Sequence, residues 1–377
     1  MGNCCKKKVD NQLIENLFDN KDDNPLGIQL KVKDFQRIKL LGKGSFGEVY
    51  LVKSNSNNKT YAMKILNKDY IRERQQEKHT KIERDLLSRT NCSFIVNIKF
   101  AFQDNSNLYI LTEFMQGGDL FFHLHREKRF TDEKAKFYLI EIILAIEYLH
   151  NNNMIYRDLK PENLLLDKTG HIKLTDFGLS KILKNPKEKS YTICGTPQYL
   201  APEILSNKGY DSAVDWWSLG CVFYEMLIGS YPFKIRLGES LNEDIYKKEI
   251  LIPDYVTKEA QDLIYKLLVV NPKKRLGFGP DGANKIKNHS YFKNINWKDA
   301  LNKKLIPPFI PQLKDDTDLS YFSNMFTDEK VSSVESDISG ITLSNNNDFK
   351  GFTFVANSMS NELMYMNKSS DDTNNKV

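Results

Sequence analysis

Four short motifs follow one another in a fixed order in the first half of the chain, and they constrain its fold more than any other feature. A glycine-rich run over residues 42–49 (GKGSFGEV) comes first, and Lys64 follows in the apolar segment YAMK. The run YRDLKPEN at residues 156–163 is third, and Asp-Phe-Gly at residues 176–178 is fourth. Each motif alone is common. Together they combine glycines, an ammonium group and several acids, which indicates a site for a phosphate-containing ligand.

The glycine-rich run favours close approach of the backbone to phosphate groups, because glycine has no Cβ to clash with them. A dinucleotide-binding fold would place a helix directly after the run and an acid about 20 residues further on. Here the strand-like segment 49–52 follows instead. A Walker-type loop would need Lys-Ser or Lys-Thr after the last glycine, but Glu48 follows Gly47. The sequence therefore disfavours both of these nucleotide-binding folds.

Lys64 is a charged residue in an apolar, strand-like segment. Burying a lysine is costly unless it pairs with an anion, so its side chain either reaches solvent or pairs with a phosphate and a carboxylate. Glu83, on the helical segment that follows, is the candidate carboxylate, and Glu73 and Glu77 are its competitors.

The hydrophobic pattern divides the chain into a strand-rich part and a helix-rich part. Alternating apolar and polar residues predict short strands at 35–41, 49–52, 60–65, 95–102 and 108–114, with one helix at 72–90. Beyond residue 117 the pattern becomes helical, and apolar helices are predicted at 132–150, 211–229 and 257–269. Phe309, Tyr321 and other scattered aromatics at 293–328 predict an extended segment packed on another part of the chain.

The four motifs together resemble the signature of eukaryotic protein kinases. Residues 35–356 resemble the AGC group in particular, in which Tyr156 is usual where many kinases have histidine. The tail spacing is most similar to that of ribosomal-protein kinases, then of protein kinase B-like and protein kinase A-like enzymes. The resemblance implies an α+β bilobal fold: a small β-rich lobe with one regulatory helix, a large helical lobe and an AGC-type C-terminal tail.

The same resemblance implies a division of the chain into four parts. Residues 1–34 are expected to form an N-terminal extension and 35–292 the kinase domain. Residues 293–356 would form the AGC tail with its hydrophobic motif. The polar terminus 357–377 is expected to be disordered.

The resemblance also implies roles for single residues. Asp158 would accept the proton of a substrate hydroxyl, Lys160 would steady the transferring phosphoryl group, and Lys64, held by Glu83, would contact the α- and β-phosphates of ATP. Asn163 and Asp176 would hold Mg²⁺. The residues expected to bind the nucleotide are Leu41, Gly42, Lys43, Gly44, Ser45, Phe46, Gly47, Val49, Ala62, Lys64, Glu113, Met115, Leu165, Thr175, Asp176 and Phe322. Thr112 precedes the adenine-binding segment as a small gatekeeper.

Three phosphorylation sites are expected from the resemblance: Thr192 in the activation loop, Thr353 in the hydrophobic motif and Ser336 in a turn-motif position. A phosphate on Thr192 would need nearby cations, and the family supplies them from the positions of Arg157, Lys181 and His79.

Further structural contacts follow from the family pattern. Phe349 and its neighbouring aromatics would dock beside the helix at 72–90 and turn Glu83 toward Lys64. Glu203 would pair with Arg275, and Asp215 would brace the catalytic loop.

Asp119 and Glu162 are acids at positions where this group reads arginine upstream of the phosphorylated residue. The expected function is therefore a basophilic serine/threonine protein kinase that acts on proteins and is itself activated by an upstream kinase. The alternative is a catalytically weak, pseudokinase-like signalling scaffold. Such a scaffold would be expected to lose at least one of the residues Lys64, Asp158, Asn163 and Asp176, and all are present.

Composition limits the classes of ligand and partner that the chain is expected to bind. A formal net charge of +5 over 377 residues argues against nucleic acid as a ligand, and a monomer is expected. No run of about 20 apolar residues is present. Gly2, Cys4 and Cys5 are candidate acylation sites beside three lysines, although Lys6 stands where the myristoylation motif has Ser or Thr. We expect a cytoplasmic protein held by lipid on the cytoplasmic face of a membrane.

Overall fold

The computed structural model describes residues 30–44, 47–185, 188–206, 208–233, 245–246, 248–329, 349–356 and 359. The chain divides into two compact units. The helical unit takes its described residues from His123–Leu164 and Leu179–Pro308, and the sheet unit takes them from Asn20–Phe122, Leu165–Gly178 and Phe309–Val377. C-terminal residues thus belong to the same unit as the glycine-rich run.

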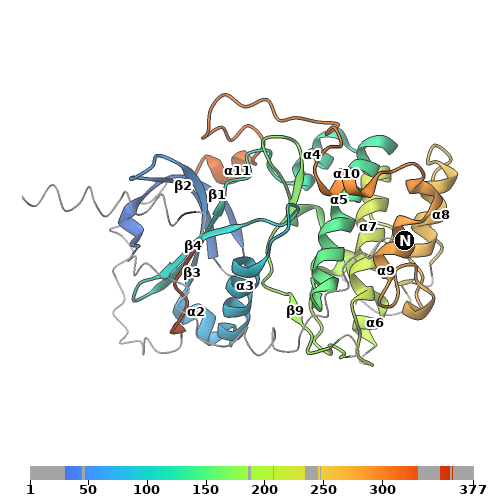
Figure 1. Cartoon of the computed structure of the whole chain (residues 1–377), viewed down its shortest axis with the longest axis horizontal. Helices are drawn as coiled ribbons and strands as arrows, with labels where there is room; N and C mark the ends of the chain where they lie inside the picture. Colours follow the sequence, from blue (N-terminus) through green and yellow to red (C-terminus); the bar gives the residue numbers. More distant parts are fainter. Residues whose placement is uncertain are drawn as a thin grey trace, which may run out of the picture. The chain divides into compact units, whose positions relative to one another are not determined.

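The sheet unit is built on a six-stranded sheet with the order β1-β2-β3-β5-β4-β10, in which all neighbouring strands are antiparallel. Figure 1 labels four of these strands, β1 to β4. Its strands are β1 (Phe35–Gly44), β2 (Gly47–Ser54), β3 (Thr60–Asn67), β4 (Ile98–Gln103), β5 (Asn107–Glu113) and β10 (Phe354–Val355). All five strands predicted from the alternating pattern are present. The strand predicted from residue 95 begins only at Ile98, because Ile95 forms a parallel bridge with Leu174 instead.

Side chains on a strand alternate between the two faces of the sheet, so Lys64 and Met63 lie on opposite faces. Met63 belongs to a buried apolar cluster that spans the strands on its face. Five aromatic residues form the centre of this cluster, and we call their surface the outer aromatic face: Phe35, Tyr61, Phe100, Phe102 and Tyr109. The opposite face carries Lys64.

The helix predicted at 72–90 is two helices, α2 (Lys68–Glu73) and α3 (Glu77–Arg89). The prediction of one helix was wrong because Gln75 takes a left-handed conformation with φ of 54° and ends the first helix. Neither glycine nor proline marks this break in the sequence, so helical spacing alone could not reveal it. The sheet unit also contains the short elements η1 (Val32–Asp34), β8 (Ile172–Leu174) and α11 (Asn324–Thr327).

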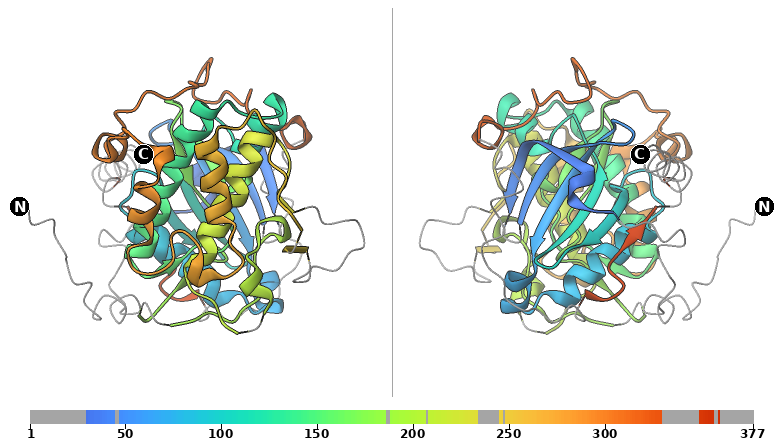
Figure 2. Two further views of the ribbon diagram at one scale, coloured as in Figure 1. Left: turned by 90° about the vertical axis from the view of Figure 1, so that its right-hand side faces the viewer. Right: turned by 90° about the vertical axis from the view of Figure 1, so that its left-hand side faces the viewer.

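The chain passes from one unit to the other within α4 (Leu120–Glu127) and within β7 (Leu164–Leu166). In the helical unit, α7 packs against both α5 and α8 (Figures 1 and 2). The elements of this unit are α5 (Asp132–Asn151), β6 (Met154–Ile155), η2 (Pro161–Asn163), β9 (Lys181–Ile182), η3 (Pro197–Tyr199), α6 (Pro202–Leu205), α7 (Ala213–Ile228), α8 (Lys258–Leu267), η5 (Pro272–Lys274), α9 (Gly282–Lys287), η6 (Ser290–Phe292) and α10 (Trp297–Leu301).

The three helices predicted in this part of the chain are confirmed as α5, α7 and α8. The Thr131 hydroxyl accepts the N–H of Lys134 and caps the start of α5. Gly229, at φ of 78°, ends α7 in the left-handed conformation that glycine adopts without strain. Among the described residues, no helix is both long and apolar enough to cross a membrane.

Candidate active site

One group of predicted site residues lies in the sheet unit around Lys64. Lys64 Nζ donates to Glu83 Oε1 at 2.7 Å and lies 3.5 Å from Asp176 Oδ1. Of the three candidate acids on the following segment, Glu83 is therefore the partner. Glu73 is exposed at the end of α2, and Glu77 begins α3.

The charges around Lys64 determine its protonation. Burial alone would lower the pKa of Lys64, but the carboxylates of Asp176 and Glu83 outweigh this effect and raise its pKa above the ordinary value. Burial raises the pKa of Glu83, and the Lys64 charge opposes that rise. Lys64 is consequently a fixed cation over the whole physiological pH range.

Asp176 presents a carboxylate from a strained backbone position. Its φ is 56°, a conformation that a residue with a side chain adopts only at a cost. The Asp176 side chain is 50% exposed. The N–H of Gly178 donates to Asp176 Oδ1 at 3.4 Å, and the side chain of Phe177, the residue between these two, is buried. An exposed carboxylate held in one orientation is suited to bind a cation.

The glycine-rich run forms the β1–β2 hairpin, in which Gly42 pairs with Val49 and Gly44 with Gly47. Gly47 has φ of 155°, and a Cβ placed there would lie 1.9 Å from the carbonyl oxygen of Ile65. Only glycine fits this close approach of two backbones. Lys43 pairs with Glu329 at 2.7 Å and Glu48 at 3.6 Å. Ser45 and Phe46 lie outside the described residues.

The residues predicted to line the adenine site belong to the sheet unit and are all half-buried: Leu41, Val49, Ala62, Leu165 and Thr175. Strand register places Ala62 opposite Thr112, the predicted gatekeeper, on β5. Half-buried apolar side chains beside strand ends are suited to cover an aromatic base.

The segment from Glu113 to Met115, called the hinge, begins at the last residue of β5. Glu113 Oε1 accepts hydrogen bonds from Lys173 Nζ at 2.6 Å and from Asn97 N at 2.9 Å. The Lys173 side chain is mostly buried on β8. No sequence motif marks this contact, and Lys173 and Asn97 were not among the predicted site residues.

The C-terminal tail packs on the hinge, as the aromatic pattern at 293–328 predicted. The ring of Phe322 stacks on Phe114 with 5.6 Å between centroids, and Gln116 Nε2 donates to the carbonyl oxygen of Asp315 at 2.9 Å. Gly118, at φ of 72°, leaves space for the backbone of Tyr321, since a Cβ would lie 2.1 Å from its carbonyl oxygen. Phe322 therefore lies beside Phe114, which stands between Glu113 and Met115, the two positions predicted to bind adenine.

A second group of predicted residues lies in the helical unit around Asp158. Thr196 Oγ1 donates to Asp158 Oδ1 at 2.7 Å, and Asn163 Nδ2 donates to Asp158 Oδ2 at 3.0 Å. Lys160 Nζ lies 3.0 Å from Asp158 Oδ2 and 2.9 Å from Thr196 Oγ1. Asp158 is buried, so these partners fix the orientation of its carboxylate. Thr196 was not among the predicted site residues, and its bond to Asp158 is seen only in the structure.

Asp215 braces the catalytic loop, as predicted. Its buried carboxylate accepts the N–H of Tyr156 at 3.0 Å and the N–H of Arg157 at 2.8 Å, and it lies 2.8 Å from His150 Nε2. Arg157 has φ of 71°. These bonds offset the cost of its left-handed backbone and thereby position the next residue, Asp158.

The predicted phosphosite Thr192 is exposed in the helical unit. Arg157 donates to the Ser190 hydroxyl at 3.0 Å and to the Tyr210 hydroxyl at 3.2 Å, and Tyr210 OH donates to the carbonyl oxygen of Thr192 at 2.6 Å. A guanidinium is thus linked through one tyrosine to the backbone of the phosphosite.

The other two cations expected near a phosphate on Thr192 have partners of their own. Lys181 lies in the helical unit and pairs with Glu188 at 3.2 Å. His79 lies in the sheet unit, where its Nδ1 bonds with Gln76 Oε1 at 2.8 Å.

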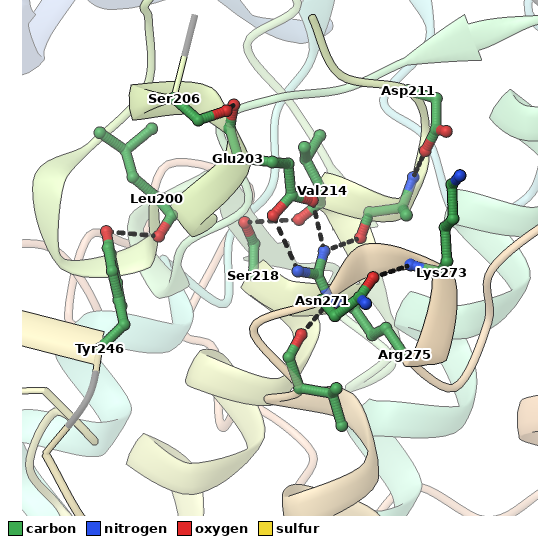
Figure 3. Close-up of polar contacts among 12 residues, drawn as sticks. Leu200, Glu203, Ser206, Asp211, Val214, Ser218, Tyr246, Asn271, Lys273 and Arg275 are labelled. Atoms are coloured by element: carbon green, nitrogen blue, oxygen red, sulfur yellow. Dashed lines mark hydrogen bonds and ion pairs between the residues drawn. The ribbon is translucent and has the colours of Figure 1, made fainter. Parts of the chain in front are cut away.

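The predicted pair of Glu203 and Arg275 is present and buried (Figure 3). Arg275 donates two hydrogen bonds to the Glu203 carboxylate, at 2.6 Å and 2.8 Å. Its remaining donors bond to the carbonyl oxygens of Ala213 at 2.9 Å and Val269 at 3.1 Å. The ion pair thereby joins α6 to the start of α7 and the end of α8.

The two acids predicted to read basic substrates have different surroundings. Glu162 is exposed on η2. Asp119 accepts the N–H of Phe122 at 2.7 Å and so caps the start of α4.

A third acid, Glu225 on α7, was missed by sequence analysis. Tyr199 OH donates to its Oε2 at 2.6 Å. Burial raises the pKa of Glu225 to about 7, and the charge of Glu162 adds to the rise. The available signal was an acid within the predicted apolar helix 211–229, flanked there by apolar residues.

The hydrophobic motif at residues 349–354, called the aromatic motif from here on, docks beside α2 and α3, as predicted. Phe349 and Phe352 are fully buried, and Arg84 of α3 donates to the carbonyl oxygen of Gly351. Thr353 is half-buried and stands between Phe352, which is buried, and Phe354, which is half-buried. The predicted phosphosite Ser336 and the predicted acylation sites Gly2, Cys4 and Cys5 lie outside the described residues.

The residues present fit a nucleotide and Mg²⁺. Asp176 offers an exposed carboxylate, and Asn163 uses its amide nitrogen on Asp158, which leaves oxygen as its metal-binding atom. The part of the chain that the structure describes holds no cluster of three or more His, Cys, Asp or Glu suited to a metal. Mg²⁺ typically takes only one or two protein ligands and fills its shell with phosphate oxygens and water, so each of these two residues, Asp176 in the sheet unit and Asn163 in the helical unit, offers a suitable oxygen.

Comparison with known proteins agrees with the geometry. Residues 35–292 match the family model described as the protein kinase domain, and residues 313–354 match the protein kinase C terminal domain. Three relatives illustrate the similarity.

RAC-beta serine/threonine-protein kinase of Rattus norvegicus is 44% identical over 332 residues, covering 87% of this chain and 69% of the relative. RAC family serine/threonine-protein kinase homolog of Dictyostelium discoideum is 42% identical over 328 residues, covering 87% of this chain and 73% of the relative. Ribosomal protein S6 kinase beta of Caenorhabditis elegans is 43% identical over 350 residues, covering 92% of this chain but 63% of the relative. The chain spans about two thirds of the length of these relatives.

Proposed function

The chain belongs to the protein kinase family, as a serine/threonine kinase of its AGC group, and we propose that it is catalytically active with ATP and Mg²⁺. One observation carries the proposal: Asp158 is held by Asn163, Lys160 and Thr196 within hydrogen-bonding distance. A general base needs a fixed orientation toward the proton that it accepts. In a catalytically inactive kinase nothing would require the carboxylate of Asp158 to be held by three side chains.

The residues of this chain divide the work of phosphoryl transfer. Asp158 accepts the proton of the substrate hydroxyl, and Lys160 places positive charge beside it. Lys64, kept protonated by its two carboxylate neighbours, contacts phosphate oxygens. Asp176 and Asn163 hold Mg²⁺, which neutralises charge on the phosphate groups when bound.

Basic protein segments are the proposed substrates. Glu162 is exposed, and the carboxylate of Glu225 lies close enough for their charges to interact. Two neighbouring carboxylates repel each other, and an arginine side chain bound between them would relieve this repulsion. Asp119, in the sheet unit, is a further acid proposed to bind basic residues of substrates. This arrangement favours peptides with arginine upstream of the phosphorylated Ser or Thr.

A direct assay tests activity and preference together. The full chain is incubated with ATP, Mg²⁺ and two peptides that differ only in having arginine or alanine upstream of the serine. We expect phosphorylation of the arginine peptide, its loss with EDTA, and a loss of about 10²–10⁴-fold in kcat for Asp158→Asn. Wild-type turnover equal to that of Asp158→Asn would support the scaffold alternative. Equal use of both peptides would contradict the basophilic proposal.

Activation is proposed to require phosphorylation by an upstream kinase at Thr192, with further sites at Thr353 and Ser336. Exposure of Thr192 and its link to Arg157 through Tyr210 support the first site. Mapping of phosphopeptides from the native protein tests all three sites. Thr192→Ala should lower kcat at least tenfold, and unchanged activity would exclude this residue as the switch.

Membrane attachment is proposed from the sequence alone. Acylation of Gly2, Cys4 or Cys5 beside a run of lysines would supply the two signals that stable anchoring needs. Cell fractionation of Gly2→Ala, with intact mass of the wild type, tests it. Unchanged membrane content of Gly2→Ala would reject myristoylation, and a wild-type mass without acyl groups would reject the anchor.

Light scattering of the purified protein tests the proposed monomer.

A further inference from the structure

The outer aromatic face of the sheet unit is a continuous stacked surface on the side opposite Lys64. Phe35 stacks on Phe102 with 5.9 Å between ring centroids, and Phe102 stacks on Tyr109 at 4.8 Å. Tyr61 meets Phe100 edge to face at 5.5 Å. All five rings are buried, although they lie on one side of a single sheet. An apolar patch of this kind requires a cover.

The cover includes residues that follow the aromatic motif in the sequence. Val355 and Met359 are 3% and 5% exposed and belong to the same cluster as the five aromatic rings. Ala356 packs against the cluster from its margin, and Leu30 joins it from before the first strand. We call Val355, Ala356 and Met359 the apolar latch.

Strand pairing explains why the latch reaches this face. β10 adds to the edge of β4, with Val355 opposite Phe100 and Phe354 opposite Ala101 (Figure 2). Residues directly opposite in an antiparallel pair point to the same face, so Val355 shares the outer face with Phe100. The backbone bond from Ala356 N to Lys99 O, at 3.0 Å, extends the pairing by one residue.

The last residue of the latch, Met359, belongs to the same cluster as the rings. Met359 N donates to the carbonyl oxygen of Ala356 at 2.8 Å. This bond ties Met359 to the residue that follows β10, and Met359 is 5% exposed within the cluster. The flexible, unbranched methionine side chain fits irregular space between aromatic rings, and sulfur contacts with such rings are favourable.

The aromatic motif and the latch hold β4 from its two sides. The motif lies on the side of α2 and α3. There Lys68 Nζ and Arg72 Cζ lie over the ring of Phe349, at 5.6 Å and 5.7 Å from its centroid. Gln103 of β4 donates to the carbonyl oxygen of Phe349 at 2.9 Å. The latch lies on the outer aromatic face. Because only a few residues separate the two contacts, release of one makes the other easier to lose.

We propose that the apolar latch is a separate docking element that keeps the aromatic motif in place, with the outer aromatic face as its binding site. The motif contacts α3 through Arg84, and α3 carries Glu83. The latch therefore supports the Lys64–Glu83 bond from the other side of the sheet. Its effect on turnover rests on the proposed kinase function, whereas the docking itself does not.

Hydrogen exchange of the full chain tests docking without any assay of activity. Met359→Asp places a charge against the aromatic rings, and we expect amide exchange at 98–103 and 349–356 to become at least about tenfold faster. Met359→Leu keeps an apolar side chain and should behave as wild type. Met325→Asp is the matched control, because Met325 belongs to the same tail but is 74% exposed, and it should leave exchange unchanged.

Turnover of the arginine peptide by the same variants tests the consequence. We expect Met359→Asp to lower kcat/KM several-fold and to add little in a Phe352→Ala background, because both changes release the same segment. Faster exchange in an enzyme that shows no turnover even as wild type would uphold the latch and refute the proposed function. Unchanged exchange in Met359→Asp and in a chain ended after Ala356, with an active wild type, would overturn the latch alone.

Discussion

Lys173 Nζ lies 2.6 Å from Glu113 Oε1, and the same oxygen accepts the N–H of Asn97 at 2.9 Å. The start of the hinge is thereby attached to β8 and to the residue before β4. Backbone groups of the hinge are the proposed contacts of adenine, so a residue outside every recognised motif sets their position.

Lys173→Met should weaken ATP binding through this contact. Without the ammonium, the Glu113 carboxylate can turn away and the hinge backbone can shift. We expect the KM for ATP to rise about fivefold to tenfold while kcat stays within about twofold. Steady-state kinetics at saturating peptide measure both. Lys173→Arg should restore most of the affinity, and Lys168→Met, at an exposed lysine of the neighbouring turn, should have no effect. A fall in kcat with an unchanged KM would contradict a positioning role.

Arg275→Leu should strongly destabilise the helical unit. The Arg275 side chain is fully buried and Glu203 nearly so, and removing one partner of a buried ion pair costs about 3–5 kcal/mol. The three tryptophans, Trp216, Trp217 and Trp297, all lie in this unit, so urea unfolding followed by tryptophan fluorescence reports it.

The control for this experiment is an exposed pair in the same unit. Lys266 and Asp262 lie 2.7 Å apart but are about half exposed, and Lys266→Leu should cost no more than about 1 kcal/mol. Equal losses for the two variants would show that burial of the Arg275 pair is unimportant for stability.

Glu225 should make peptide binding dependent on pH. Its pKa of about 7, against an ordinary 4.5, means that it becomes charged as the pH rises through 7. The KM for the arginine peptide should therefore fall between pH 6 and 8, and Glu225→Gln should flatten this profile. An unchanged profile in Glu225→Gln would show that another group titrates.

The same group affects stability with a defined sign. Between pH 4.5 and about 7 the folded protein holds a proton on Glu225 that the unfolded chain has released. Folding is therefore favoured by lower pH in this window and loses this contribution as the pH rises to 7. Urea unfolding of wild type and Glu225→Gln across the window should show a difference that changes in this direction.

Thr112→Met should alter inhibitor sensitivity rather than catalysis. Thr112 is half-buried on β5 opposite Ala62, and a larger side chain would fill space behind the predicted adenine position. Bulky ATP-competitive inhibitors should lose at least about tenfold in affinity, since overlap with the larger side chain is costly. The KM for ATP should change little. Equal inhibition of both proteins would show that Thr112 does not control access.

Most catalytic residues could be predicted because their chemistry dictates residue type and order. A phosphate-binding lysine, a base and oxygen ligands cannot be exchanged for other residues, so Lys64, Asp158, Asn163 and Asp176 are visible as motifs. Lys173 and Glu225 could not be found in this way. Their roles depend on which side chains surround them, and neither has a fixed distance in sequence from its partner.

The sequence by itself determined the fold class, the strands and apolar helices, and the chemistry of the motifs, because periodicity and residue type are local properties. Only the tertiary structure decided which acid pairs with Lys64, that a helix breaks at Gln75, and that Met359 covers the outer aromatic face. The physical reason is that burial and pairing arise from residues far apart in the chain. The role of Met359 could not be predicted from its position in the sequence, because it depends on the pairing of β10 with β4 and on the cluster that Met359 shares with Phe100.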